Sequence, residues 1–406
     1  MKDLQTILRR ARVLDEAGEP YVLATVVQTS GSVYRGPGTR MLIEADLQSL
    51  GTISGGCLEG DVRENAQAVF ADGQPRLLHY DATSEDDILW GTGLGCSGTV
   101  DVLLERLPQD APFHYPTFLH GCALENRHGV LVSVFATEGG TNAAPGQHLI
   151  LDEREQSGLS AVRPPHGGRV GAANARDDIA DLELREIALN AASEILATLN
   201  DTRLPIAPGY THHYELTHGK AALLIEPLLP PIALYLFGAG YDAVPLAQLA
   251  GELGWRVTVA DHRPAYARAE RFPWARQVLL AQPGHLPEDL QFDNRSCAVI
   301  MSHNYLQDQA LLRDLLGAPL AYLGVLGPHQ RTQRLLADLQ KEGVAPSDEQ
   351  AARLFSPVGL DIGAETAEEI ALSILGEIQA ALTGRQGGSL RDHPGPIHDR
   401  PTASSA

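Results

Sequence analysis

The sequence predicts an α/β protein with two domains, the second of which contains a doubly wound parallel sheet. A glycine turn, Gly238-Ala-Gly240, stands between an apolar strand-like run at 233–237 and a helical stretch at 242–253. Strand-like and helical stretches then alternate, which is typical of a Rossmann-like domain. The chain has 406 residues, more than one hydrophobic core normally supports, so we expect a separate α+β domain before the glycine turn.

The proline cluster at 227–231 is the best domain boundary, because neither a helix nor an inner strand tolerates proline well. We therefore expect an N-terminal α+β domain over 1–228 and a Rossmann-like domain over 229–384. The tail over 385–406 has little apolar content and is expected to be flexible. The middle segment, 108–220, is poorly defined by its pattern.

Apolar periodicity predicts the individual elements. In the first domain we expect helices at 3–17, after Cys57 and at 182–199, and strands at 21–28, 40–44, 49–54, 99–105, 131–136 and 149–151. In the second domain we expect strands at 277–281, 297–302 and 321–326 and helices at 306–317 and 330–341. A last helix begins at the capping-box spacing Thr366-Ala-Glu-Glu369 and ends at Gly384. No internal repeat is evident in the sequence.

Composition excludes several classes of function. The formal net charge is −20, which argues against a nucleic-acid or anionic-membrane partner. The most apolar window, 221–240, is interrupted by Glu226 and three prolines, so we expect no membrane span. The N-terminus has charges inside its only apolar stretch and does not resemble a signal peptide. Four cysteines without a disulfide pattern indicate a reduced, cytoplasmic protein.

Two cysteines stand in glycine-rich surroundings. Cys57 follows Gly55 and Gly56 and precedes Glu59 at the expected start of a helix, where the helix dipole favours a reactive thiolate. Cys96 stands in a second loop with Gly93 and Gly95. A ligand that approaches the backbone closely would explain the glycines, but so would a tight turn around a small buried thiol.

A third glycine-rich loop carries groups suited to an anion. Ser30, Ser32 and Arg35 lie in this loop, residues 29–38, and Arg40 follows it. Hydroxyl and guanidinium groups bind phosphate well. Plain turn chemistry is the alternative. A binding role for this loop is favoured because all three glycine-rich segments lie within the first hundred residues.

In the second domain, ligands are expected at the carboxyl ends of the parallel strands. The residues that follow those ends are Gly238, Gly240, Tyr241, Asp261, Arg263, His303, Asn304 and Gly327. Asp261 is placed to meet a ribose hydroxyl, although Arg263 leaves a phosphorylated ribose open. His303 could serve as a general acid or base, or simply be hydrogen bonded.

Several of these motifs resemble the XdhC/CoxI family of molybdenum cofactor-binding accessory proteins. The resemblance includes Thr29-Ser-Gly-Ser-Val-Tyr-Arg-Gly-Pro-Gly-Thr-Arg-Met41, Gly55-Gly-Cys-Leu-Glu59, Gly93-Leu-Gly-Cys-Ser-Gly98, Phe237-Gly-Ala-Gly240, Val259-Ala-Asp-His-Arg263, Ser302-His-Asn-Tyr305, Tyr322-Leu-Gly-Val-Leu-Gly-Pro328 and Gly359-Leu-Asp-Ile-Gly-Ala-Glu-Thr366. The chain departs from the family pattern at Ser97, Tyr241 and Ser302. Segment 108–220 carries little of the resemblance.

The resemblance implies a protein that binds molybdenum cofactor (molybdopterin), protects it and delivers it to a xanthine dehydrogenase-type molybdenum hydroxylase. Arg35 and Arg40 would hold the pterin phosphate, and Cys57 and Cys96 would lie near molybdenum. A cysteine desulfurase is expected as a further partner, and a homodimer as the assembly. Two alternatives stay open: an NAD(P)-dependent oxidoreductase that uses the Rossmann-like domain, and a maturation scaffold with a vestigial nucleotide pocket.

Overall fold

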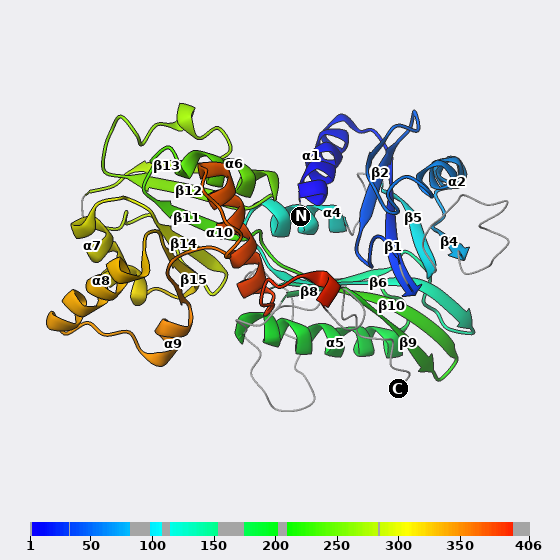
Figure 1. Ribbon diagram of the computed structural model, residues 1–406. Coiled ribbons are helices and arrows are strands. Elements are labelled where there is room, and N and C mark those ends of the chain that lie inside the picture. The colour runs from blue at the N-terminus through cyan, green and yellow to red at the C-terminus, as the bar shows by residue number, and fades with distance from the viewer. Residues whose placement is uncertain are drawn as a thin grey trace. The chain divides into compact units, whose positions relative to one another are not determined.

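The computed structural model describes residues 2–31, 33–81, 98–107, 114–152, 174–201, 209–282 and 285–392 (Figure 1). These residues form two compact units, and the chain passes from one to the other at Pro230–Pro231. Each unit has its own hydrophobic core, as the composition requires for a chain of this length.

The first unit contains two sheets with the same topology. Its elements are α1 (Lys2–Ala17), β1 (Tyr21–Gly31), β2 (Arg40–Glu44), β3 (Ser49–Gly51), α2 (Glu59–Asp72), β4 (Arg76–Asp81), β5 (Gly98–Leu107), α4 (Tyr115–Leu124), β6 (Gly129–Gly139), β7 (His148–Asp152), β8 (Asn174–Asp177), α5 (Leu182–Asp201), β9 (Tyr210–Leu216) and β10 (Gly219–Leu228). The first sheet has the order β3-β2-β1-β5-β4, and the second has the order β8-β7-β6-β10-β9. The described elements therefore run twice through one pattern, which we call repeat 1 (residues 2–107) and repeat 2 (residues 114–228).

The expectation of no internal repeat is thus wrong, and the two copies agree in detail. Strands β1 and β6 have the same length and the same burial pattern. Both carry a bulge at the equivalent position, Val27 in β1 and Phe135 in β6. Gly38 donates its N–H to Val26 in repeat 1, and Gly146 donates its N–H to Val134 in repeat 2. Residues 21–44 and 129–152 align without a gap.

The repeat escapes notice in the sequence because few side chains are shared. The aligned segments keep Gly31 and Gly139, Pro37 and Pro145, and Gly38 and Gly146. The four glycines all have positive φ, between +68° and +87°, a backbone region that favours glycine. The other identical pairs are Val22 and Val130, Leu23 and Leu131, Val26 and Val134, and Thr29 and Thr137. Matches that are apolar do not distinguish a repeat from any pair of buried strands.

Two buried pairs of a basic and an acidic side chain cross between the repeats. Arg40 on β2 donates hydrogen bonds from Nη1 and Nη2 to the two carboxylate oxygens of Glu226 on β10, at 2.9 and 2.6 Å. Its equivalent, His148 on β7, lies 2.8 Å from Glu105 on β5. Glu105 and Glu226 are themselves equivalent positions of β5 and β10. Each repeat thus supplies the basic group of one pair and the acid of the other.

Helices pack on both sheets. Helix α2 packs on the first sheet through Val62, Ala66 and Val69. Helix α5 runs along one face of the second sheet (Figure 1). The equivalent helices α1 and α4 pack against each other in a shared cluster with strands of both repeats.

The second unit is a parallel six-stranded sheet of order β13-β12-β11-β14-β15-β16. Its elements are β11 (Ala233–Phe237), α6 (Ala243–Glu252), β12 (Arg256–Asp261), β13 (Gln277–Leu280), β14 (Ser296–Ile300), α7 (Tyr305–Leu316), β15 (Leu320–Val325), α8 (His329–Lys341), α9 (Asp348–Ala352), β16 (Leu354–Phe355) and α10 (Ala367–Leu382), with short 3₁₀ turns at Ala269–Arg271 and Leu390–Asp392. All its strand pairs are parallel. This is the strand order of a Rossmann fold, which confirms the predicted fold class.

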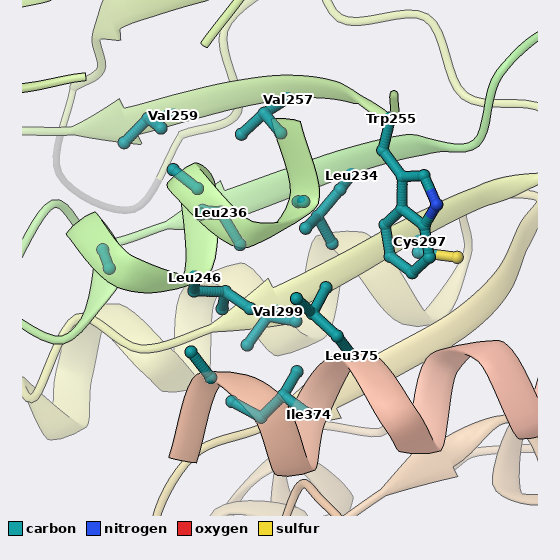
Figure 2. Packing of buried hydrophobic residues seen from close by; sticks show 14 of the residues in the cluster. Leu234, Leu236, Leu246, Trp255, Val257, Val259, Cys297, Val299, Ile374 and Leu375 are labelled. Atoms are coloured by element: carbon teal, nitrogen blue, oxygen red, sulfur yellow. The ribbon is translucent and has the colours of Figure 1, made fainter. Parts of the chain in front are cut away.

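Apolar side chains fill both faces of this sheet. Figure 2 shows strand residues such as Leu236 and Val299 pointing toward Leu246 of α6 and Ile374 of α10. Leucines of α7 and α8 cover the other face. Thr366 and Glu369 form the capping box that the sequence predicts at the start of α10. Within the described residues, no helix is both long enough and apolar enough to cross a membrane.

Candidate cofactor-binding site

The glycine-rich segments of repeat 1 lie at one end of its sheet. Strand β1 ends at Gly31, which pairs with Gly98 at the beginning of β5. Strand β3 runs parallel to β1, because both pair antiparallel with β2, and it ends at Gly51 before the Cys57 loop. The described residues do not include Ser32, Gly93, Gly95 or Cys96. The chain enters β5 at Gly98, beside the end of β1.

Tyr34 lies on the loop that follows β1, and its ring contacts the Cys57 loop. Its ring lies so close to Gly55 that an added Cβ would be 3.3 Å from it. The ring is nevertheless 66% exposed. The guanidinium of Arg35 lies 5.5 Å from the ring centre and bonds Asp3 at 3.2 Å. Ser30 is exposed at the end of β1.

Glu59 organises the Cys57 loop. Its carboxylate accepts hydrogen bonds from the N–H groups of residues 53, 54 and 56 and from the hydroxyls of Thr52 and Ser54. Partial burial alone would raise its pKa, but the hydrogen bonds from Ser54 and Thr52 lower the pKa to about 2. Glu59 is therefore ionised at neutral pH and holds the loop rather than facing a ligand.

Cys57 is an exposed free thiol on this loop. Gly55 and Gly56 precede it with φ of +85° and +119°, and nothing lies within 4 Å of a Cβ built on Gly56. The thiol can therefore meet a ligand without a change in the fold. Cys122 and Cys297 are buried, and burial raises the pKa of both thiols.

Arg40 has a different environment from Arg35. Its side chain is 2% exposed and is committed to Glu226. Of the two arginines predicted to bind phosphate, only Arg35 reaches the surface. The partnership of Arg40 has no signal in the sequence, because Glu226 follows it by 186 positions.

In the second unit, Asp261 closes the glycine turn. One carboxylate oxygen accepts the N–H of Ala239 at 2.7 Å, and both oxygens bind Arg263. Burial would raise the pKa of Asp261, but Arg263 and the Ala239 N–H lower it. A ribose hydroxyl would have to share an acid that is already fully hydrogen bonded.

The glycine turn also meets the end of β14. A Cβ on Gly238 would lie 2.3 Å from the carbonyl oxygen of Met301, and Gly238 has φ of +124°, so glycine is required there. His303 follows with a positive φ of +58° and lies 2.8 Å from Asp242 at the start of α6. Tyr241 is 81% exposed.

Asn304 and Gly327 serve neighbouring helices. The Asn304 side chain caps α7 by accepting the N–H of Gln307. Gly327 has φ of +128° and precedes α8, whose Arg331 binds the buried Asp308 at 2.8 Å. Burial raises the pKa of Asp308, although Ser302 and Arg331 oppose this. Sequence patterns missed this pair because both residues lie inside helices.

The crevice at the carboxyl ends of β11, β12 and β14 is narrow. Its cavity is about 20 Å³ and is lined by Gly238, Asp261, His262, Ser302 and Gln307, among others. That is room for about one water molecule. Side chains would have to move before a nucleobase could enter. In the described part of the chain, no three His, Cys, Asp or Glu residues are grouped to hold a metal ion.

The chain thus combines a duplicated α+β unit, with a thiol and an arginine on adjacent loops, with a Rossmann-like unit. Residues 14–81 match the XdhC and CoxI family, and residues 234–378 match the XdhC Rossmann domain. A Bacillus subtilis protein, named as a probable subunit of xanthine dehydrogenase, is 34% identical over 363 residues, 89% of this chain and 93% of its own. The chain belongs to the XdhC and CoxI family.

Two more distant proteins are similar over most of the chain. The molybdenum cofactor insertion chaperone PaoD of Escherichia coli is 22% identical, over 93% of this chain and 88% of its own. A crystal structure of a Bacillus halodurans protein, described as a xanthine dehydrogenase, superposes with a TM-score of 0.66 and 27% identity. It covers 95% of this chain and 98% of its own.

Proposed function

We propose that this protein binds molybdenum cofactor and delivers it to a xanthine dehydrogenase-type molybdenum hydroxylase. The supporting observation is that Cys57 and Arg35 reach the surface on adjacent loops, and that Glu59 holds the Cys57 loop in shape without a ligand. The family and the name of PaoD point to the same cargo. A site for a carrier must hold its cargo and still release it, and exposed loops suit that requirement better than a closed cage.

Each exposed group has a role in this proposal. Arg35 and Ser30 offer the charge and hydroxyl donors that a pterin phosphate needs. The cargo's dithiolene already supplies sulfur to molybdenum, so Cys57 need only approach the metal from an open side. We propose Cys96 as a second thiol, because the segment that carries it leads into β5 at Gly98, beside the end of β1. Arg40 is assigned to the frame, because its guanidinium is committed to Glu226.

The partners follow from the chemistry of the cargo. A hydroxylase of this class needs a terminal sulfide on molybdenum, and we assign its supply to a cysteine desulfurase that docks on this protein. A homodimer remains our expectation for the assembly, and light scattering on the purified protein would measure it. The Rossmann-like unit is the candidate site for NAD(P) or another nucleotide, with His303 and Asp242 at its strand ends.

The test is retention of the cargo. Purified protein is mixed with molybdenum cofactor, freed of unbound ligand by rapid gel filtration, oxidised and assayed for pterin fluorescence. We expect near-stoichiometric retention by the wild type and its loss in a Cys57→Ser, Arg35→Ala double variant. Arg9→Ala, which removes an exposed arginine of α1, is the matched control and should retain the cargo.

The same experiment separates the alternatives. Saturable binding of NADH without retention of pterin would favour the oxidoreductase. Retention of neither ligand, with capture of a desulfurase and a hydroxylase, would favour the scaffold.

A further inference from the structure

The duplication provides an internal comparison for the proposed site. Two copies of one backbone share the residues that the fold needs, so a functional residue should occur in one copy only. The turn that follows β1 and the turn that follows β6 have the same frame. Gly31 and Gly139 begin them with positive φ, and Thr39 and Gln147 close them with equivalent backbone bonds to residues 36 and 144.

Surface groups differ between the two turns. Tyr34 corresponds to Asn142, Arg35 to Ala143 and Ser30 to Glu138. The second copy thus keeps the glycine and proline frame but has neither the aromatic ring, nor the guanidinium, nor the exposed hydroxyl. No Gly-Gly-Cys sequence precedes α5, which follows Ile179-Ala-Asp181. The fold itself therefore does not require Tyr34 or Arg35.

The two turns also contact their helices differently. In repeat 2, Asp181 accepts bonds from the Thr141 hydroxyl at 2.7 Å and from the Asn142 N–H at 3.1 Å, which ties the turn to the start of α5. In repeat 1, the equivalent turn contacts the segment before α2 through the Tyr34 ring, which lies against Gly55. This is the only such contact described for these residues. Tyr34 is left 66% exposed, and Cys57 follows by two positions the glycine that the Tyr34 ring covers.

An exposed aromatic face backed by glycine is a platform for a flat ring. Aromatic side chains stack on planar heterocycles at little entropic cost, because they have few rotatable bonds. The guanidinium carbon of Arg35 lies over the same ring, 5.5 Å from its centre, and supplies a positive charge next to the platform. Cys57 follows Gly55 and Gly56 directly in the sequence. A ligand that carries a flat ring, a phosphate and a soft metal would offer one group to each of these three side chains.

We propose that repeat 1 is the ligand-binding copy and repeat 2 the structural copy, and that Tyr34 is the stacking platform for the pterin ring of the cargo. This inference rests on the proposed function and assigns a residue to it. Arg35 is assigned to the phosphate and Cys57 to molybdenum. Gly55 is a positioning residue, because its φ of +85° favours glycine and a Cβ there would press on the Tyr34 ring at 3.3 Å.

The test exchanges residues of repeat 1 for their equivalents in repeat 2. Tyr34→Asn and Arg35→Ala each install a side chain that this backbone already carries elsewhere, so both variants should fold. Thr39→Gln is the matched control, since it also installs a repeat 2 residue but changes neither the ring nor the charge. Tyr34→Phe keeps the ring and removes only the hydroxyl.

Full-length variants are loaded with molybdenum cofactor, and the release rate of the pterin is followed after gel filtration. We expect Tyr34→Asn to release it about tenfold faster, in line with the loss of one stacking contact. Tyr34→Phe and Thr39→Gln should behave as the wild type, and all melting temperatures should agree. Equal release by Tyr34→Asn and wild type would overturn the platform. Failure of the wild type to retain any pterin would instead overturn the proposed function.

Discussion

Glu59 is predicted to bind the cofactor, but its carboxylate serves the loop that carries it. The sequence predicts it among the cofactor-binding residues because it follows Gly55-Gly-Cys57. In the structure its carboxylate points back into the loop and collects the N–H and hydroxyl donors there. A local motif reports that residues act together, but it does not report which of them faces outward.

Replacement of Glu59 should have a pH-dependent effect. Glu59→Gln should lower the free energy of unfolding by about 1–3 kcal/mol at pH 7, because a charged acceptor of several hydrogen bonds is lost. The pKa is lowered to about 2 in the folded protein from about 4.3 in an unfolded chain. The stabilisation is therefore present above about pH 4.3 and is lost as the pH falls toward 2.

Thermal unfolding between pH 7 and pH 2 measures this effect. The difference between wild type and Glu59→Gln should shrink as the solution becomes acidic. Glu64→Gln, an exposed position on the same helix, is the control and should differ little from the wild type at any pH. A difference that stays constant down to pH 2 would contradict the role given to the carboxylate.

The buried pair of Arg40 and Glu226 should be costly to break. Arg40→Ala should lower the free energy of unfolding by about 3–5 kcal/mol, because it leaves the Glu226 charge buried without its partner. The double variant Arg40→Met, Glu226→Leu should recover most of the loss. Denaturant unfolding compares them, with Arg12→Ala, from the exposed pair with Glu16, as the control. A small effect of Arg40→Ala would show that Arg40 is free for a ligand.

At the scale of elements, periodicity predicts most of the Rossmann-like unit. The expected strands at 277–281, 297–302 and 321–326 correspond to β13, β14 and β15, and the expected helices correspond to α7 and α8. Buried parallel strands and two-faced helices have strong patterns. In the first unit, β4 escapes prediction because it is a largely exposed edge strand. The sequence also does not predict that the two sheets duplicate each other, because this depends on contacts between residues distant in the sequence.

The start of α6 bears on the nucleotide question. Asp242 places a carboxylate where the helix dipole would otherwise receive a pyrophosphate. If the Rossmann-like unit binds a dinucleotide, Asp242→Asn should tighten binding about fivefold or more by removing the repulsion. Fluorescence titration with NADH measures the affinity, and Asp314→Asn on the exposed face of α7 is the control. Unchanged affinity in Asp242→Asn would place any nucleotide away from this turn.

At the scale of the whole molecule, the sequence predicts two domains, a Rossmann-like fold and the family, because glycine turns and their flanking residues are read locally. It does not predict the duplication in the first unit, which only the strand order and register make visible. The duplication separates residues that serve the frame, such as the glycine and proline pairs, from residues present in one copy only. The proposed cargo site consists of the latter.

Transfer of the cargo tests the central claim most directly. The protein loaded with molybdenum cofactor is freed of excess ligand and mixed with a cofactor-free xanthine dehydrogenase-type hydroxylase, and hydroxylase activity is followed after treatment with sulfide. We expect activity to appear in proportion to the loaded protein, and the Cys57→Ser, Arg35→Ala variant taken through the same loading to give almost none. A wild-type protein that retains no cofactor, or that retains it without activating the hydroxylase, would contradict the account.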